Sequence, residues 1–183
     1  MRMHFTPIVE SLPSVVPFVG PETQERARGR KFRARIGANE SVFGPSPRAV
    51  EAMRHAAAEV WKYCDPENHD LKQALAALQD TAHLAGVVGK VSAARERIAA
   101  IARANGLKPL PSAANFVAVD CRNDGAFARR VLSELISRDV FVRMPGVSPL
   151  DRCIRVSAGL PSDLDVFEEA LPRALGAAAG RRP

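Results

Sequence analysis

The 183-residue chain has few aromatic residues, few cysteines and no long hydrophobic run. Aromatic residues make up 5% of it, so small apolar residues, alanine above all, must fill most of a core. The three cysteines, Cys64, Cys121 and Cys153, are far apart, which excludes a fully paired disulfide framework and a CxxC zinc or redox motif. We therefore expect reduced thiols and a cytoplasmic protein.

No stretch approaches the roughly 18 apolar residues that a membrane-spanning helix needs. The apolar run at the N-terminus is interrupted by Glu10 and three prolines, so it does not resemble a signal peptide. The composition, 46% hydrophobic and 25% charged, is that of a globular protein. The length allows one domain, or one domain with an appendage.

Positive charge is in excess, with a formal net charge of +6, and most basic residues are arginines. One dense basic cluster consists of Arg26, Arg28, Arg30, Lys31, Arg33 and Arg35. It fits either a polyanion-binding segment or a solvated basic arm. Only Phe32 interleaves it to stack on bases, so we favour the solvated arm and expect no nucleic-acid partner.

The N-terminal half is predicted to be an extended arm followed by helices. Prolines are expected to keep residues 1–35 extended. Ser46 and Pro47 have the residue types of an N-cap and a first helical position, so a helix is expected from there to about Val60. A second helix should begin near His69. From Leu71 to Ala104 the sequence predicts almost continuous helix, which is long for a domain of this size.

The C-terminal half is predicted to be a small β-α-β-β-α layer with its helices on one face. Strands are expected at residues 115–119, 140–143 and 153–157. Asn105-Gly106 is typical of a helix C-terminus, and Asp124 should cap the next helix. The segment 162–165 (SDLD) predicts the start of a last helix, and Pro172 should kink or end it.

Other motifs fit no chemistry. Gly86 to Ser92 (GVVGKVS) lacks the first glycine, the hydroxyl residue after lysine and the preceding strand of a phosphate-binding loop. The histidines have no metal-ligand spacing, and the acidic residues 65–70 lack the glycine of a calcium loop. No metal site is predicted.

Two blocks resemble histidinol-phosphate aminotransferase and its relatives, a family of fold-type I aminotransferases. The first is Arg35–Pro47 (RIGANESVFGPSP), followed by a helix and Trp61–Pro66 (WKYCDP). The second comprises Leu110–Phe116 (LPSAANF), Val140–Arg143 (VFVR) and Cys153–Gly159 (CIRVSAG). They occur in the family's order. The resemblance implies an α/β fold, of which this chain would hold an α+β remnant.

The resemblance also implies that the family's central cofactor-binding domain is deleted between Leu78 and Thr81. The family holds pyridoxal phosphate through a Schiff-base lysine, an aspartate at the pyridinium nitrogen and a phosphate loop. None of these has a counterpart here. We expect an arm over 1–35, an N-terminal aminotransferase segment over 36–79, a connecting helix over 80–106 and the C-terminal small domain over 107–183.

Five residues match site positions of the family. Tyr63 resembles the tyrosine that reaches the cofactor phosphate of the other subunit of the dimer. Arg155 and Arg143 resemble arginines that bind anionic groups of the substrate, because a guanidinium donates two parallel hydrogen bonds to an oxyanion. Asn39 and Asn115 lie in site-lining segments. The alternative for both arginines is a purely structural role, in which each pairs with a surface carboxylate.

By resemblance, the activity is pyridoxal-phosphate-dependent amino transfer from a histidinol-phosphate or aromatic amine to 2-oxoglutarate, in amino-acid biosynthesis. Without the lysine region we expect this chain to be inactive alone and to expose apolar surface on its helices. Two alternatives are a site completed by Lys90 or by a full-length partner subunit, and a small basic protein that binds polyanions.

Overall fold

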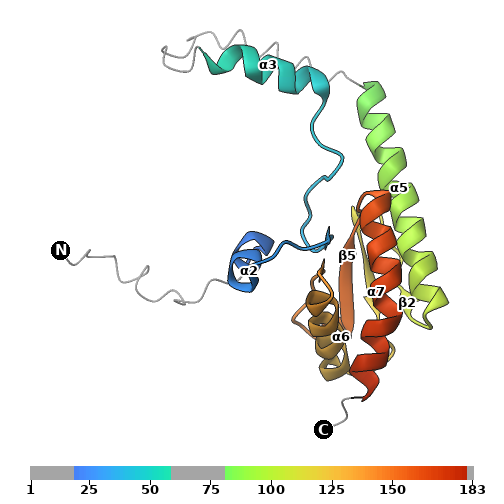
Figure 1. The fold of residues 1–183 in the computed structure, drawn as a ribbon. Coiled ribbons are helices and arrows are strands. Elements are labelled where there is room, and N and C mark those ends of the chain that lie inside the picture. Colours follow the sequence, from blue (N-terminus) through green and yellow to red (C-terminus); the bar gives the residue numbers. More distant parts are fainter. Residues whose placement is uncertain (1–18, 59–80, 181–183) are drawn as a thin grey trace, which may run out of the picture. The chain divides into compact units, whose positions relative to one another are not determined.

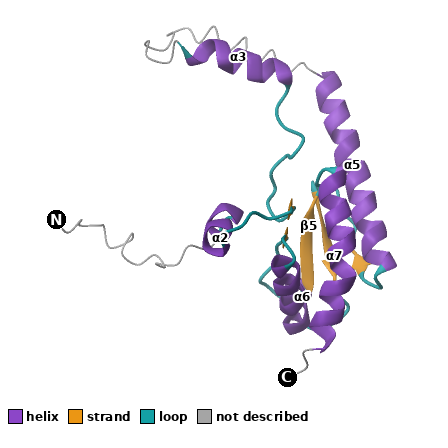
Figure 2. Cartoon of the chain, viewed as in Figure 1, coloured by secondary structure: helices purple, strands orange, loops and turns teal. Residues whose placement is uncertain are grey.

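A computed structural model describes residues 19–58 and 81–180. The chain divides into two compact units, Met1–Phe32 and Arg33–Pro183. Figures 1 and 2 show the elements. In chain order these are α2 (Pro21–Arg28), β1 (Ala34–Arg35), α3 (Pro47–Ala57), α5 (Thr81–Ala104), β2 (Lys108–Pro109), β3 (Phe116–Asp120), α6 (Gly125–Ser137), β4 (Val140–Phe141), the 3-10 turn η2 (Leu150–Arg152), β5 (Cys153–Ser157) and α7 (Pro161–Gly180).

The described part of the first unit contains a helix, so the expectation of an extended arm over 1–35 is wrong for this part. Pro21 is the first residue of α2, where its fixed φ suits a helix and its missing N–H is not needed. Gly29 ends the helix with φ 69°. The Arg28 guanidinium lies 4.3 Å from the centroid of the Phe32 ring, so part of the basic cluster is engaged within the chain.

The central feature of the second unit is a three-stranded antiparallel sheet in the order β2-β3-β5. In the β3–β5 ladder Val117 faces Val156 and Val119 faces Ile154. Side chains alternate along a strand, so these four point to one face of the sheet. All four are buried.

Helices α5, α6 and α7 pack on that face. Their buried side chains join the four strand residues in a single hydrophobic cluster. Ile98 comes from α5, Val131 and Leu135 from α6, and Phe167 and Leu171 from α7. This confirms the predicted mixed α and β fold with its helices on one face. Figure 1 shows α7 and α6 running along β5.

The strand predicted at 140–143 lies in a different sheet from the one its neighbours suggest. Strand β4 pairs in parallel with β1, with Ala34 opposite Val140 and Arg35 opposite Phe141. A single bridge between Arg143 and Arg155 links this pair to β5. Strand β1 falls inside the predicted arm. Two residues give no periodic signal, so only pairing with β4 reveals it.

Local capping signals explain two helix ends. The Asp124 carboxylate accepts a hydrogen bond of 2.7 Å from the Phe127 N–H, which confirms Asp124 as the N-cap of α6. Helix α5 ends at Ala104, and Gly106 follows with φ 73°. The Leu107 N–H donates to the Ala102 carbonyl over 3.0 Å, which makes this the expected glycine-containing C-terminus.

Two predictions about α7 need correction. The helix begins at Pro161, one residue before the predicted starting segment 162–165. The Asp163 carboxylate accepts a hydrogen bond of 2.9 Å from the N–H of Leu160, the residue just before the helix. The acidic residue therefore caps the helix from within its first turn. Of the two outcomes predicted for Pro172, a kink or an end, the end is excluded, because the helix continues to Gly180. Buried Ala174 and Ala178 hold the second half of α7 against the core despite the missing hydrogen bond.

Helix α3 begins as predicted, with Ser46 as N-cap and Pro47 at the first position, and is described to Ala57. Helix α5 is described from Thr81. The second helix predicted near His69, the predicted join between Leu78 and Thr81, and the first part of the predicted long helix lie outside the described residues.

Cys121 and Cys153 are free and buried. Burial raises the pKa of the Cys121 thiol to about 12 and also raises that of Cys153. Both are therefore poorly reactive core residues. Within the described residues, no helix is long and apolar enough to cross a bilayer. Across residues 19–58 and 81–180, no group of three or more His, Cys, Asp or Glu side chains is placed to hold a metal.

Candidate functional site

The candidate site lies on the face of the sheet that turns away from the helices. Arg155 occupies the middle of β5, between buried Ile154 and Val156. Since side chains alternate along the strand, Arg155 points to the opposite face from these two. Its partner across the ladder is the small residue Ala118. The strand therefore presents a guanidinium on the face that the core does not use.

The guanidinium of Arg155 has one hydrogen-bond partner among the described residues. Its Nη2 donates to the Gly37 carbonyl oxygen over 3.3 Å. Its central carbon lies 5.1 Å from the centroid of the Phe116 ring. The Nε–H is buried and has no partner. Five N–H donors are available on an arginine side chain, so most of this donor capacity is unused.

Arg143 lies beside Arg155 through the backbone. The Arg143 N–H donates to the Arg155 carbonyl over 3.2 Å, and the Arg155 N–H donates to the Arg143 carbonyl over 2.6 Å. Both side chains are partly buried. The bridge therefore holds the two arginines side by side, directly opposite each other on neighbouring segments.

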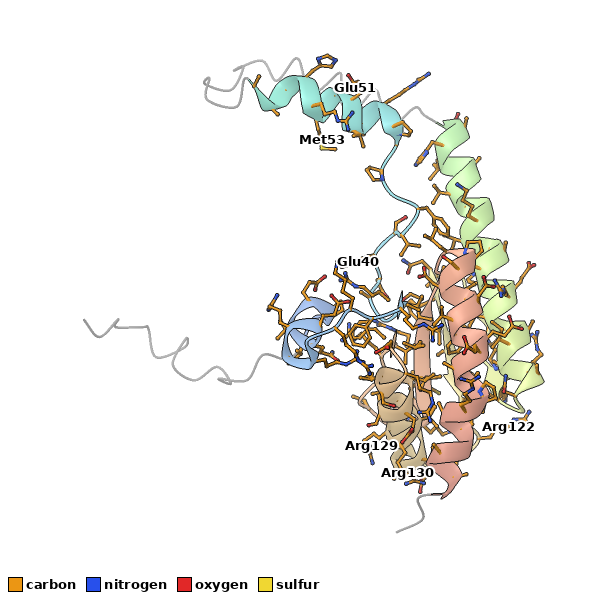
Figure 3. The ribbon with its side chains drawn as sticks, in the orientation of Figure 1. Glu40, Glu51, Met53, Arg122, Arg129 and Arg130 are labelled. Atoms are coloured by element: carbon orange, nitrogen blue, oxygen red, sulfur yellow. The ribbon has the colours of Figure 1, made fainter. Side chains whose placement is uncertain are left out.

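Backbone hydrogen bonds bring the N-terminal segment to the end of β5. The Ser157 N–H donates to the Ile36 carbonyl over 2.7 Å. The Asn115 Nδ2 donates to the Asn39 carbonyl oxygen over 3.3 Å, and the Asn115 carbonyl accepts from the Ala158 N–H over 2.8 Å. Residues far apart in sequence thus form one cluster. Figure 3 labels Glu40, the residue that follows Asn39 on this segment.

Glycine is required at position 37 by the packing. A Cβ atom there would lie 2.6 Å from the Phe141 ring and 3.0 Å from the Val142 backbone. The close approach lets the Gly37 carbonyl reach Arg155. Ser157, two residues from Arg155 on the same face of β5, has a buried hydroxyl that finds no hydrogen-bond partner in the part of the chain that the structure describes.

The surroundings of Arg155 destabilise the positive charge on its guanidinium. Burial lowers the pKa of the Arg155 guanidinium, and the nearby charge of Arg143 lowers it further. An arginine still stays protonated at neutral pH. None of the described residues supplies a carboxylate to Arg155, so pairing with a surface carboxylate does not describe it. An anion bound here would relieve both effects.

The structure brings together four of the five predicted site residues: Arg155, Arg143, Asn115 and Asn39. The fifth, Tyr63, lies outside the described residues. Sequence reasoning missed the contributions of Gly37 and Phe116. The strand predicted at 115–119 contains Phe116, and alternation along β3 places this ring on the face that carries Arg155.

No family model matches the chain. It is 33% identical over 117 residues to histidinol-phosphate aminotransferase of Roseiflexus castenholzii, covering 61% of this chain and 32% of that protein. It is 39% identical over 103 residues to histidinol-phosphate aminotransferase 1 of Mesorhizobium japonicum, covering 56% and 27%. The chain therefore matches about a third, or less, of the length of these relatives.

A comparison with solved structures finds a protein with the same name as these relatives. The histidinol-phosphate aminotransferase from Sinorhizobium meliloti, crystallised in complex with pyridoxal-5'-phosphate, matches with a TM-score of 0.85 and 25% identity. The match covers 96% of this chain and 98% of the solved chain. The chain is therefore similar in sequence to the histidinol-phosphate aminotransferases, and its α/β fold matches that of a solved member of that group.

Proposed function

We propose that this chain descends from a pyridoxal-phosphate-dependent aminotransferase of the histidinol-phosphate or aromatic type and keeps its anion-binding part. In this proposal the chain binds the phosphate or carboxylate of an amine phosphate or amino acid. It does not transfer the amino group by itself. The observation that carries the proposal is the unused donor capacity of Arg155 beside Arg143.

An oxyanion suits the donors that Arg155 presents. Two N–H groups of a guanidinium match the two oxygens of a carboxylate or phosphate, and charge-assisted hydrogen bonds of this kind are about twice as strong as neutral ones. The charge of an anion would also offset the burial of Arg155 and its repulsion from Arg143. Asn115, fixed by its bond to the Asn39 carbonyl, would border the bound group.

The described residues do not fit the role of holding pyridoxal phosphate for catalysis. That cofactor needs a lysine amine for its aldehyde and a carboxylate for its ring nitrogen. The described lysines are Lys31, Lys90 and Lys108, and none contacts Arg155. The buried carboxylate of Asp120 lies at the far end of β3, where it pairs with Arg152.

The remaining family properties stay part of the proposal. The relatives' name supports an ancestral role in amino-acid metabolism. A homodimer, a cytoplasmic location and a role for Tyr63 at the partner's cofactor phosphate are expected by descent. The deletion of the central domain and the division at residues 35, 79 and 106 are likewise predictions.

Anion binding is tested by titrating the purified chain with histidinol phosphate and with inorganic phosphate, followed by calorimetry. We expect Arg155→Gln to weaken binding about tenfold or more, because a hydrogen-bonded charge pair is lost. Arg129→Gln is the matched control. Arg129 is an exposed arginine on α6, labelled in Figure 3. Equal losses in both variants would contradict a specific site.

Inactivity is tested by cofactor trapping. The chain is mixed with pyridoxal phosphate and reduced with borohydride, and the intact mass and modified peptides are measured. Scattered or absent adducts are expected. One stoichiometric adduct on a single lysine, or steady transaminase turnover by the pure protein, would contradict the proposed loss of catalysis.

A further inference from the structure

A second feature, separate from Arg155, is a cavity between α5 and the start of α7. Its volume is about 390 Å³. Ala93 and Ala94 of α5 form one wall, and Leu160, Pro161 and Leu164 form another. Phe43 lies at its edge, on the segment between β1 and α3. Small-molecule sites usually have volumes of roughly 300–1,000 Å³ and mostly apolar walls, so the cavity has the size and lining of a ligand site.

Two cationic side chains border this cavity, and their situations differ. The Arg97 guanidinium donates to the Pro161 carbonyl over 3.0 Å, to Asp165 over 2.6 Å and to Glu168 over 2.8 Å. The hydrogen bonds to the two carboxylates raise the pKa of Arg97, and the bond to Glu168 has a larger effect than the bond to Asp165. Two carboxylates already neutralise its charge, so Arg97 is a poor partner for an anionic ligand.

Lys90 has no such compensation. Its ammonium nitrogen lies 5.9 Å from the centroid of the Phe43 ring. None of the described residues pairs a carboxylate with it. An ammonium beside an apolar cavity, without an anion of its own, attracts a negative group attached to an apolar body. A neutral or cationic body of the same shape would gain nothing from it.

We propose that this cavity binds a small apolar monocarboxylate, with its hydrocarbon or aryl body against Phe43, Ala93 and Leu164 and its carboxylate on Lys90. Leu160, an exposed leucine at the cavity, would be covered by the bound body. The site uses neither Arg155 nor Arg143, so it is independent of the function proposed above.

The test compares three probes that share one body: 3-phenylpropionate, 3-phenylpropionamide and 3-phenylpropylamine. Binding to the full chain is measured by calorimetry and saturation-transfer NMR. The acid should bind about three- to fivefold more tightly than the amide, the range of a partly exposed charge pair, and the amine should bind most weakly. Equal affinities for acid and amide, or no binding of any probe, would overturn the proposal.

Variants locate the bound acid. Lys90→Gln should abolish the preference for the acid, while Lys90→Arg should keep it. Lys108→Gln, at an exposed lysine away from the cavity, is the matched control and should change nothing. Ala93→Phe should fill the cavity and weaken acid and amide alike. If Arg155→Gln removed the preference and Lys90→Gln did not, the acid would lie at the other site and the proposal would be wrong.

Discussion

The two halves of α5 differ sharply, although both are rich in small apolar residues. From Ala94 onward, Ala94, Ile98, Ile101 and Ala102 are buried. Their spacing of four, seven and eight residues places them on one face of the helix. Before Ala94 no residue of α5 is buried, and Leu84 and Val88 are 58% and 59% exposed. An apolar residue in a helix is thus a core residue only where the fold supplies a partner.

Helix α3 shares the situation of the first half of α5. None of its residues is buried, and Met53, labelled in Figure 3, is 60% exposed. This agrees with the expectation that both helices expose apolar surface. Exposed apolar side chains of this kind favour self-association. The packed sheet and the unpacked helices should therefore respond very differently to mutation.

The largest difference is expected for truncation within the packed half of α5. Ile98→Ala removes a fully buried side chain and should lower the free energy of unfolding by about 3 kcal/mol, through lost transfer energy and the cavity left behind. Urea unfolding followed by circular dichroism measures it. A loss below about 1 kcal/mol would show that this half of α5 is not part of the cooperative core.

A second variant tests whether the packed region includes the N-terminal segment. Gly37→Ala places a methyl group against the Phe141 ring and the Val142 backbone, and should cost about 2 kcal/mol in the same unfolding experiment. It should also displace the carbonyl that holds Arg155 and weaken phosphate binding. Gly29→Ala is not a matched control because Gly29 has a positive φ. Gly86→Ala, in open space on α5, is the better comparison.

A third variant concerns the far end of the sheet. Burial tends to raise the pKa of the Asp120 carboxyl, but hydrogen bonds from the Arg152 side chain and the Arg122 N–H outweigh it and hold the pKa below its ordinary value. The carboxylate therefore stabilises the fold above the unfolded-state pKa of about 4, and this contribution is lost as pH falls through the lower folded-state value.

Asp120→Asn should accordingly cost about 1 kcal/mol at pH 7 and less at strongly acidic pH. Urea unfolding of the wild type and the variant at a series of pH values measures this. Asp165→Asn is a useful contrast, because that carboxylate is 67% exposed at the side chain. A difference between wild type and Asp120→Asn that did not shrink toward low pH would contradict the assigned role.

The smallest effect on stability is expected in the unpacked half of α5. The double variant Leu84→Ser/Val88→Ser should change the free energy of unfolding by less than about 1 kcal/mol, since both side chains are exposed. Its effect should appear in self-association, measured by analytical ultracentrifugation over a concentration series. Loss of stability comparable to Ile98→Ala would mean that these residues are buried in solution.

Short-range patterns account for the parts of the fold that were predicted correctly. The strand pattern of residues 153–157, the N-cap at Asp124 and the helix end at Gly106 each depend on interactions between residues only a few positions apart. Such local signals can be predicted from the sequence alone. Arg155 and Arg143 were named as site residues only through the resemblance, which did not predict the bridge between them. That these residues share one cluster with Asn39 and Asn115 was implied only by the resemblance.

Long-range pairing accounts for what was missed. Strand β1 exists because β4 lies beside it, and Pro172 stays inside α7 because the core holds the helix on both sides of it. The predicted small domain over 107–183 also shares its core with Ile36 and Ile98, which lie outside that range. The packed unit is therefore larger than the sequence segment that suggested it.

The sequence by itself determined the local elements of this protein and its resemblance to the aminotransferases. These depend on neighbouring residues or on ordered motifs. Only the tertiary structure decided which apolar residues are buried, which face of β5 carries Arg155, and that Lys90 lies beside an apolar cavity with no carboxylate partner among the described residues. Burial and charge compensation depend on residues distant in sequence, and folding alone brings those together.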